Sequence, residues 1–232
     1  TSRGDTRMEL WRSDMVRTLE YGRVDAPVNP GSQPRTGCTL LSSASTTSRT
    51  AVLEQCPGEP AARLSLLDPA PEDASEPEEY GSAVVPELVP EPEGPTAGRI
   101  IAITGSAVAL YIPAENGAPD RVGLYDDTAA KTSQFTLPAD LSPTRDSPNF
   151  PAAEAGSVYS WFTGAGVQAF DSSSLNPLWT FPRALGTGAV MAGRLLVPVP
   201  DGISVVDLST GVTTADIPVD RGDYDGPIQM SV

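Results

Sequence analysis

Two stretches of the C-terminal half decide the fold, Gly166-Val-Gln-Ala-Phe-Asp171 and Gly202-Ile-Ser-Val-Val-Asp207. The second stretch has the pattern of the first and follows it at an offset of 36 residues (Asp207 against Asp171). The residues before them, Ser157–Phe162 and Gly193–Pro198, match at the same offset. Looser copies occur earlier, at Val122–Asp126 and Arg63–Asp68. The chain is therefore built from a repeated unit.

Each copy has two short strand-like runs joined by a glycine turn. A strand-rich repeat with a period of about 40 residues is typical of β-propellers. One repeat cannot bury its apolar face alone, so successive repeats must stack. We therefore predict an all-β chain of propeller-like blades, each made of short antiparallel strands.

The strand and turn patterns predict a series of segments. We expect, in order, an N-terminal hairpin and Pro-rich loop at 1–37, a blade at 38–85, an acidic Pro-rich flexible insertion at 86–98, a blade at 99–137, a Pro-rich loop at 138–151, blades at 152–181 and 182–220, and the start of a further blade at 221–232. The insertion is expected to be mobile because its composition cannot offset the entropy of ordering by apolar burial.

The first 22 residues allow two interpretations. Met8, Trp11, Met15 and Leu19 recur at the spacing of an amphipathic helix. The same residues also fit two strands on either side of a Ser13-Asp14 turn. The repeats that follow favour the hairpin.

The overall charge and the missing residue types exclude several classes of function. The chain has 15 basic and 30 acidic residues, a formal net charge of −15. Such a chain repels nucleic acid and anionic lipid. Histidine is absent, which excludes Ser-His-Asp catalysis and histidine-ligated zinc. The single lysine, Lys131, lies outside any phosphate-binding loop motif. We expect no catalytic residue, no cofactor and no metal ion.

The two cysteines, Cys38 and Cys56, each lie at the end of a candidate strand. A hairpin of these neighbouring strands would bring them together, so a disulfide is favoured over two buried free thiols. A disulfide indicates an oxidising compartment. The sequence has no apolar run long enough for a transmembrane helix. We therefore expect an extracytoplasmic protein, secreted or held at the membrane only by an anchor outside this chain.

The recurring aspartates have an expected structural role. Asp126, Asp171 and Asp207 each begin a turn, where a carboxylate accepts hydrogen bonds from nearby backbone N–H groups. Trp179 follows such a turn, where its ring can pack between adjacent blades. The acidic stretch Asp220–Asp225 does not have the spacing of a calcium loop, so we interpret it as a solvated turn.

Three residues are candidates for contact with a partner, namely Trp161, Phe162 and Arg183. Core packing and contacts between blades are the alternative role for this trio.

The repeat also resembles a known family. Val167–Asp171 followed by Leu175-Asn-Pro-Leu-Trp179, and the Thr210-Gly211 turn, resemble the repeat of PQQ-like β-propellers. Over nearly the whole chain, the sequence is similar to uncharacterised propeller proteins of mycobacteria and corynebacteria, at Leu19–Gly31, Gly37-Cys38, Cys56-Pro57 and Leu196–Pro200. This resemblance implies an extracytoplasmic propeller with an N-terminal membrane anchor and further repeats upstream. If the resemblance applies, the chain is an incomplete, C-terminal part of a larger propeller.

These observations lead to two hypotheses of function. The first is a non-enzymatic extracytoplasmic propeller that serves as a protein-interaction scaffold in the actinobacterial cell envelope. The alternative is a propeller that binds a small ligand or a quinone cofactor, as relatives of PQQ-dependent oxidoreductases do. The second would call for metal-binding acids and adjacent cysteines, and the sequence contains no adjacent cysteines.

Overall fold

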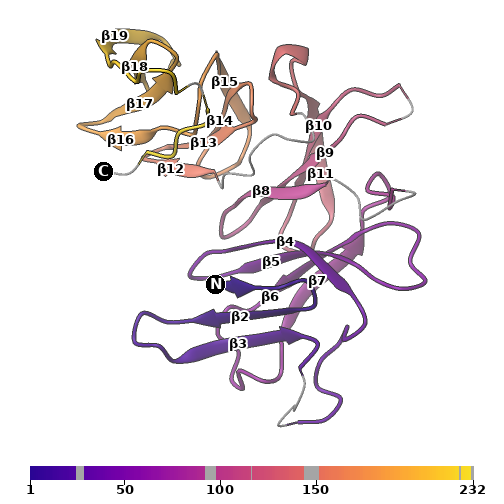
Figure 1. The fold of residues 1–232 in the computed structure, drawn as a ribbon. Coiled ribbons are helices and arrows are strands. Elements are labelled where there is room, and N and C mark those ends of the chain that lie inside the picture. The colour runs from indigo at the N-terminus through magenta and orange to yellow at the C-terminus, as the bar shows by residue number, and fades with distance from the viewer. Residues whose placement is uncertain (25–28, 92–97, 116, 144–151, 225, 231–232) are drawn as a thin grey trace. The chain divides into compact units, whose positions relative to one another are not determined.

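The chain folds into five antiparallel sheets of three or four strands (Figure 1). The computed structural model describes residues 1–24, 29–91, 98–115, 117–143, 152–224 and 226–230. Among these residues the sole helical element is a short 3-10 turn, η1 (Ala139–Leu141). No helix in the described ranges has the length and apolar character needed to cross a membrane. The predicted all-β fold of small antiparallel sheets is confirmed.

The chain divides into two compact units. Unit 1 takes in Thr1–Glu115 and Arg121–Phe135, and unit 2 takes in Asn116–Asp120 and Thr136–Val232. The first three sheets belong to unit 1. Their strands are β1 (Ser2–Arg3), β2 (Arg7–Trp11) and β3 (Arg17–Gly22); β4 (Thr39–Ser45), β5 (Thr50–Gln55), β6 (Arg63–Leu67) and β7 (Glu79–Val84); and β8 (Arg99–Ile103), β9 (Val108–Ile112), β10 (Arg121–Tyr125) and β11 (Lys131–Thr136).

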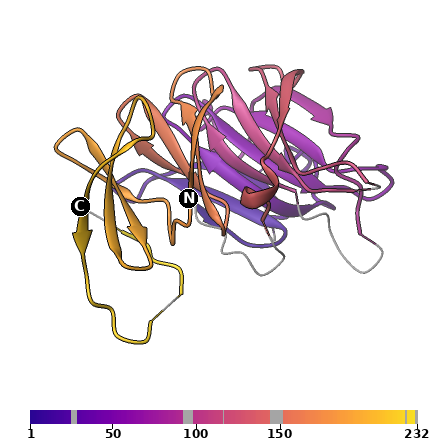
Figure 2. The same ribbon diagram turned by 90° about the horizontal axis from the view of Figure 1, so that it is seen from above.

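Unit 2 contains the two sheets that carry the sequence repeat. Their strands are β12 (Ala153–Ala155), β13 (Val158–Phe162), β14 (Gly166–Asp171) and β15 (Pro177–Pro182); and β16 (Ala189–Met191), β17 (Arg194–Val199), β18 (Gly202–Asp207) and β19 (Thr213–Pro218). Each strand pairs with the next one along the chain, so every sheet is a simple meander (Figure 2). Short turns suffice for such connections, which explains the many Gly, Pro, Asp and Ser residues between strands.

The pairing register repeats along with the sequence. Phe162 lies opposite Val167 in the fourth sheet, and Pro198 lies opposite Ile203 in the fifth. The irregularities repeat as well. The outer strands β7, β15 and β19 each have a β-bulge with one extra residue. In each case the bulge lies opposite the residues that precede the turn aspartate of the inner strand. The repeated units therefore share the same β-bulge as well as the same sequence pattern.

In unit 1 the second sheet is covered on both faces. One face presents Leu53 and Leu64, which pack with Leu110 of the third sheet. On the other face, Val52 packs with Leu19 of the first sheet. Adjacent residues of β5 point to opposite faces of the sheet, and both faces of this strand are buried. The first strands of neighbouring sheets, β4 and β8, lie close together, as the inner strands of propeller blades do.

The N-terminal sheet settles the two interpretations of residues 8–21. Met8 pairs with Tyr21 and Leu10 with Leu19, and all four side chains are buried against the second sheet. These residues form antiparallel strands and not a helix. The outer edge of β3 is completed by a side chain, because Gln33 accepts a hydrogen bond from Gly22 N–H and donates one to Glu20 O.

In unit 2 the fourth and fifth sheets stack in the same way. Phe162 and Val167 of the fourth sheet pack with Leu195, Val197 and Val206 of the fifth. Trp179 of β15 bridges the two sheets. Its Nε1 donates a hydrogen bond to Leu208 O at 2.8 Å. The expected position of this ring between neighbouring sheets is confirmed.

The aspartates at the strand ends hold the turns that follow. Asp171 Oδ1 accepts hydrogen bonds from the N–H groups of Ser173 and Ser174, and Asp207 Oδ1 accepts the equivalent pair from Ser209 and Thr210. Because the Ser209 hydroxyl also donates to the carboxylate, the pKa of Asp207 falls to about 2. The expected structural role of these aspartates is confirmed, and Asp126 bonds Thr128 and Ala130 in the same manner.

The segments at 86–98, 138–151 and 221–232 agree only in part with the structures expected for them. Leu88, in the segment expected to be a flexible insertion (86–98), is fully buried in the core of unit 1, so this residue fixes the start of that segment. Residues 92–97 lie outside the described residues. Likewise, Leu141 at the start of the 138–151 loop is buried, and residues 144–151 are not described. No strand forms at 221–224 or 226–230, where Ile228 N–H instead donates to Leu185 O.

The contact between Trp179 and Gly211 provides a test of the stacking in unit 2. Gly211 has φ 71°, and a Cβ at this position would lie 2.6 Å from Trp179 Cδ2. Gly211→Ala should therefore lower the free energy of unfolding by about 3 kcal/mol, from backbone strain and overpacking together. Gly193→Ala is the matched control, because Gly193 has φ 74° but open space around it. It should cost only about 1 kcal/mol. Equal losses in urea unfolding would contradict the steric role of Trp179.

Candidate functional site

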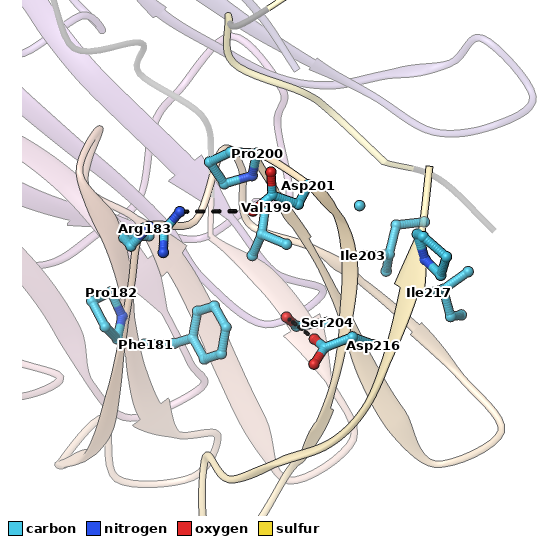
Figure 3. A pocket seen from close by; sticks show the side chains of 12 residues that line it. Phe181, Pro182, Arg183, Val199, Pro200, Asp201, Ile203, Ser204, Asp216 and Ile217 are labelled. Atoms are coloured by element: carbon cyan, nitrogen blue, oxygen red, sulfur yellow. Dashed lines mark hydrogen bonds and ion pairs between the residues drawn. The ribbon is translucent and has the colours of Figure 1, made fainter. Parts of the chain in front are cut away.

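A groove of about 430 Å³ opens in unit 2 beside the β17–β18 turn (Figure 3). We call it the Phe181 groove. Phe181, at the end of β15, lies on one side, and Ile203 of β18 and Ile217 of β19 lie on the other. Ile217 is 45% exposed, although it is a large apolar residue in a regular strand. The groove is therefore an apolar surface between two blades that neighbouring side chains do not fill.

The sequence builds this groove from the ends of strands. Pro182 ends β15, and Pro218 ends β19, because proline cannot continue the hydrogen bonding of a strand. Pro200 and Asp201 form the turn between β17 and β18. Arg183 follows Pro182 with φ 60°, a left-handed conformation that is uncommon for arginine. The Arg183 side chain is exposed at the rim of the groove.

Charged side chains lie at the rim of the groove. Arg183 Nη2 and Asp201 Oδ2 are 3.9 Å apart, and their side chains are 74% and 93% exposed. This is a long, solvated ion pair of little energetic value. Below the rim, Ser204 Oγ donates a hydrogen bond to Asp216 Oδ1 at 2.7 Å. The β17–β18 turn itself is held by the Arg221 guanidinium, which donates to the backbone oxygens of Val199 and Gly202.

The structure separates the three residues proposed for partner contact. Trp161 and Phe162 are 1% and 2% exposed, so they pack in the core and do not form a surface. Arg183 is exposed at the rim of the Phe181 groove. Trp161 and Phe162 therefore have the alternative role of core packing, and Arg183 alone of the three is exposed.

A second concentration of polar groups lies inside unit 1, and we call it the Glu54 cluster. Glu54 is fully buried, and its Oε1 accepts hydrogen bonds from Tyr21 at 2.7 Å and Ser65 at 2.6 Å. Arg35 lies 3.8 Å from the same oxygen and also pairs with Glu79. Oε2 of Glu54 has no hydrogen-bond partner within the described part of the chain. Burial of this carboxyl raises the pKa of Glu54, and the bonds from Ser65 and Tyr21 oppose the shift only in part.

The two cysteines lie next to the Glu54 cluster and form the predicted disulfide. Cys38 and Cys56 are joined, with Cα atoms 4.2 Å apart, and both are buried. Their sulfur atoms and a Glu54 carboxylate oxygen lie within 4.8 Å of one another. Metal ions bind cysteine as the thiolate, and a disulfide has none, so these residues do not form a metal site as they stand.

The stacked sheets define the class of this protein as all-β with propeller-like blades. No family model matches the chain, and no curated protein matches it. Among solved structures it is similar to KlHsv2 with loop 6CD replaced by a Gly-Ser linker, at 11% identity and a TM-score of 0.43, over 75% of this chain and 50% of that one. It is also similar to BamB from Moraxella catarrhalis, at 10% identity and a TM-score of 0.38, over 92% and 69%. The chain thus spans about half the length of the Hsv2 chain.

The disulfide should contribute measurably to stability. It closes a loop with a sequence separation of 18. In the chain-entropy model a loop of this size stabilises a fold by about 3 kcal/mol. Replacing both residues, Cys38→Ser with Cys56→Ser, should therefore lower the free energy of unfolding by about that amount in urea titrations. Wild-type protein kept reduced is the control and should show a comparable loss. Unchanged unfolding midpoints in both would contradict this role.

Glu54 should make stability depend on pH. Because its pKa is raised on folding, the native state binds more protons than the unfolded state between the ordinary value near 4.5 and the raised value. The free energy of unfolding therefore decreases as pH rises through this window. Glu54→Gln should remove this decrease, so the variant gains stability relative to wild type as pH rises from 4 to 9. Parallel profiles for the two proteins in urea unfolding across this range would show that Glu54 does not titrate as described.

Proposed function

We propose that this chain is part of a non-enzymatic, extracytoplasmic scaffold that binds a partner protein through the Phe181 groove. The observation that carries the proposal is the open groove itself, which presents Phe181, Ile203 and Ile217 to solvent between charged rim residues. Partly apolar surfaces with a charged rim are typical of protein-binding sites. The antiparallel sheets beneath supply a rigid base for such contacts.

Two further observations support the proposed location. The buried Cys38–Cys56 disulfide is of the kind that forms and persists in oxidising compartments outside the cytoplasm. The sequence resemblance to envelope proteins of mycobacteria and corynebacteria favours the cell envelope, with any membrane anchor outside this chain. The net charge of −15 makes nucleic acid an unsuitable partner.

Site-specific photo-crosslinking in an actinobacterial envelope tests this function. A benzophenone side chain at Pro182, which is exposed in the groove, should capture a discrete partner protein. The same group at Met191 is the matched control and should not capture the partner. Met191 is 57% exposed and ends β16, beside the start of β17, whereas the groove lies beside the end of β17. Equal capture at both positions, or at neither, would contradict a partner-binding groove. A visible-spectrum change on adding pyrroloquinoline quinone and calcium would instead support the cofactor-binding alternative.

A further inference from the structure

A second hollow adjoins the Phe181 groove. It has a volume of about 570 Å³ and is lined by Asp220, Tyr224 and neighbouring residues. We call it the Asp220 hollow. Pro200, Asp201 and Pro218 line both concavities, so the two adjoin with Asp201 at the junction, and we call them together the depression. Two adjoining concavities fit an extended chain segment better than a compact ligand.

The two parts of the depression differ in chemistry. The Phe181 groove has large apolar side chains on both sides, with polar side chains between them, and its volume lies in the range of ligand-binding pockets. One large apolar side chain between Phe181 and Ile217 would bury the exposed face of Ile217. Such burial favours binding because it removes apolar area from water. The first requirement on an occupant is therefore a bulky apolar residue.

The junction and the Asp220 hollow are acidic. Asp201, Asp216 and Asp220 contribute three carboxylates to the combined depression, against the guanidinium groups of Arg183 and Arg221. Arg221 is engaged by the backbone of the β17–β18 turn. Among the described residues, the Asp201 carboxylate has the long contact with Arg183, and its side chain is 93% exposed. A cation placed beside Asp201 would therefore meet a carboxylate that can pair with it.

We propose that the depression binds an extended segment of a partner protein in which a bulky apolar side chain and a lysine or arginine lie about two residues apart, because alternate side chains of an extended segment point to the same side. The apolar side chain occupies the Phe181 groove, and the basic side chain reaches Asp201 at the entrance to the Asp220 hollow. This inference rests on the proposed function and names the partner chemistry of the same site. It matches the acidic character of the chain, which favours the approach of basic partners.

Fluorescein-labelled dodecapeptide pools test the inference. In the first pool every position is Gly, Ser, Thr or Asn, except for one fixed Phe and a Lys two positions later. In two matched pools, Ser replaces the Phe or Glu replaces the Lys. Fluorescence polarisation with the purified chain should show at least tenfold tighter binding of the first pool than of either matched pool. Equal binding of the Lys and Glu pools, or no binding of any pool at millimolar protein, would overturn the inference.

Variants of exposed residues assign the two contacts. Ile217→Ser should remove the preference for Phe, and Asp201→Lys should reverse the preference from Lys to Glu. Met191→Ser and Glu154→Lys are the matched controls, because both residues are exposed in unit 2 and neither lines the depression. They should bind as wild type does. Circular dichroism melting curves confirm that each variant is folded. An unchanged Lys preference in Asp201→Lys would overturn the assignment of Asp201.

The two proposals fail in different ways. Crosslinking from Pro182 combined with peptide pools that show no preference for Phe and Lys would leave the partner-binding groove standing and refute the proposed segment. Failure of crosslinking at Pro182, with the Phe and Lys preference present, would refute the envelope partner while retaining the binding chemistry of the depression.

Discussion

Apolar side chains of one sheet cover those of the next in both units, and this contact governs the rest of the molecule. A four-stranded meander with two apolar faces cannot be stable alone in water, because a large area would remain exposed. The second sheet meets this constraint on both sides, with Leu53 facing the third sheet and Val52 facing the first. Burial of apolar area contributes about 25 cal/mol per Å², so the stack and not the single sheet is the stable unit.

Stacking of the sheets does not by itself determine where each strand begins or ends. Local polar contacts determine these positions. Asp171 and Asp207 hold the turns after β14 and β18 through backbone N–H groups. Trp179 then joins the outer strand of one sheet to the turn of the next through Leu208. Together these bonds fix where β15 and β19 begin, and Pro182 and Pro218 end these two strands at the Phe181 groove. The candidate site thus lies where strand ends of two successive repeats meet.

The fold was predictable because it is encoded in local patterns. Strand alternation, glycine turns and the repeat ending at Asp171 and Asp207 are all contained within short windows of sequence. The disulfide was predictable for the same reason, since Cys38 and Cys56 end neighbouring strands. The groove was not, because it joins Phe181 and Ile217 from two repeats and depends on the space left between them. These two residues occupy equivalent repeat positions, which is the signal that could have indicated a shared surface. Trp161 and Phe162 misled because composition does not distinguish an aromatic contact surface from an aromatic core.

The bulges of β7, β15 and β19 limit how this chain can change during evolution. Each outer strand has one extra residue near its start, just after the connection from the inner strand. Side chains alternate between faces, so an insertion or deletion farther along the strand would turn the following inward-facing residues outward. Length variation in this protein should therefore accumulate in the loops that join one sheet to the next, and lineages that gain or lose sheets should do so in whole multiples of the repeat.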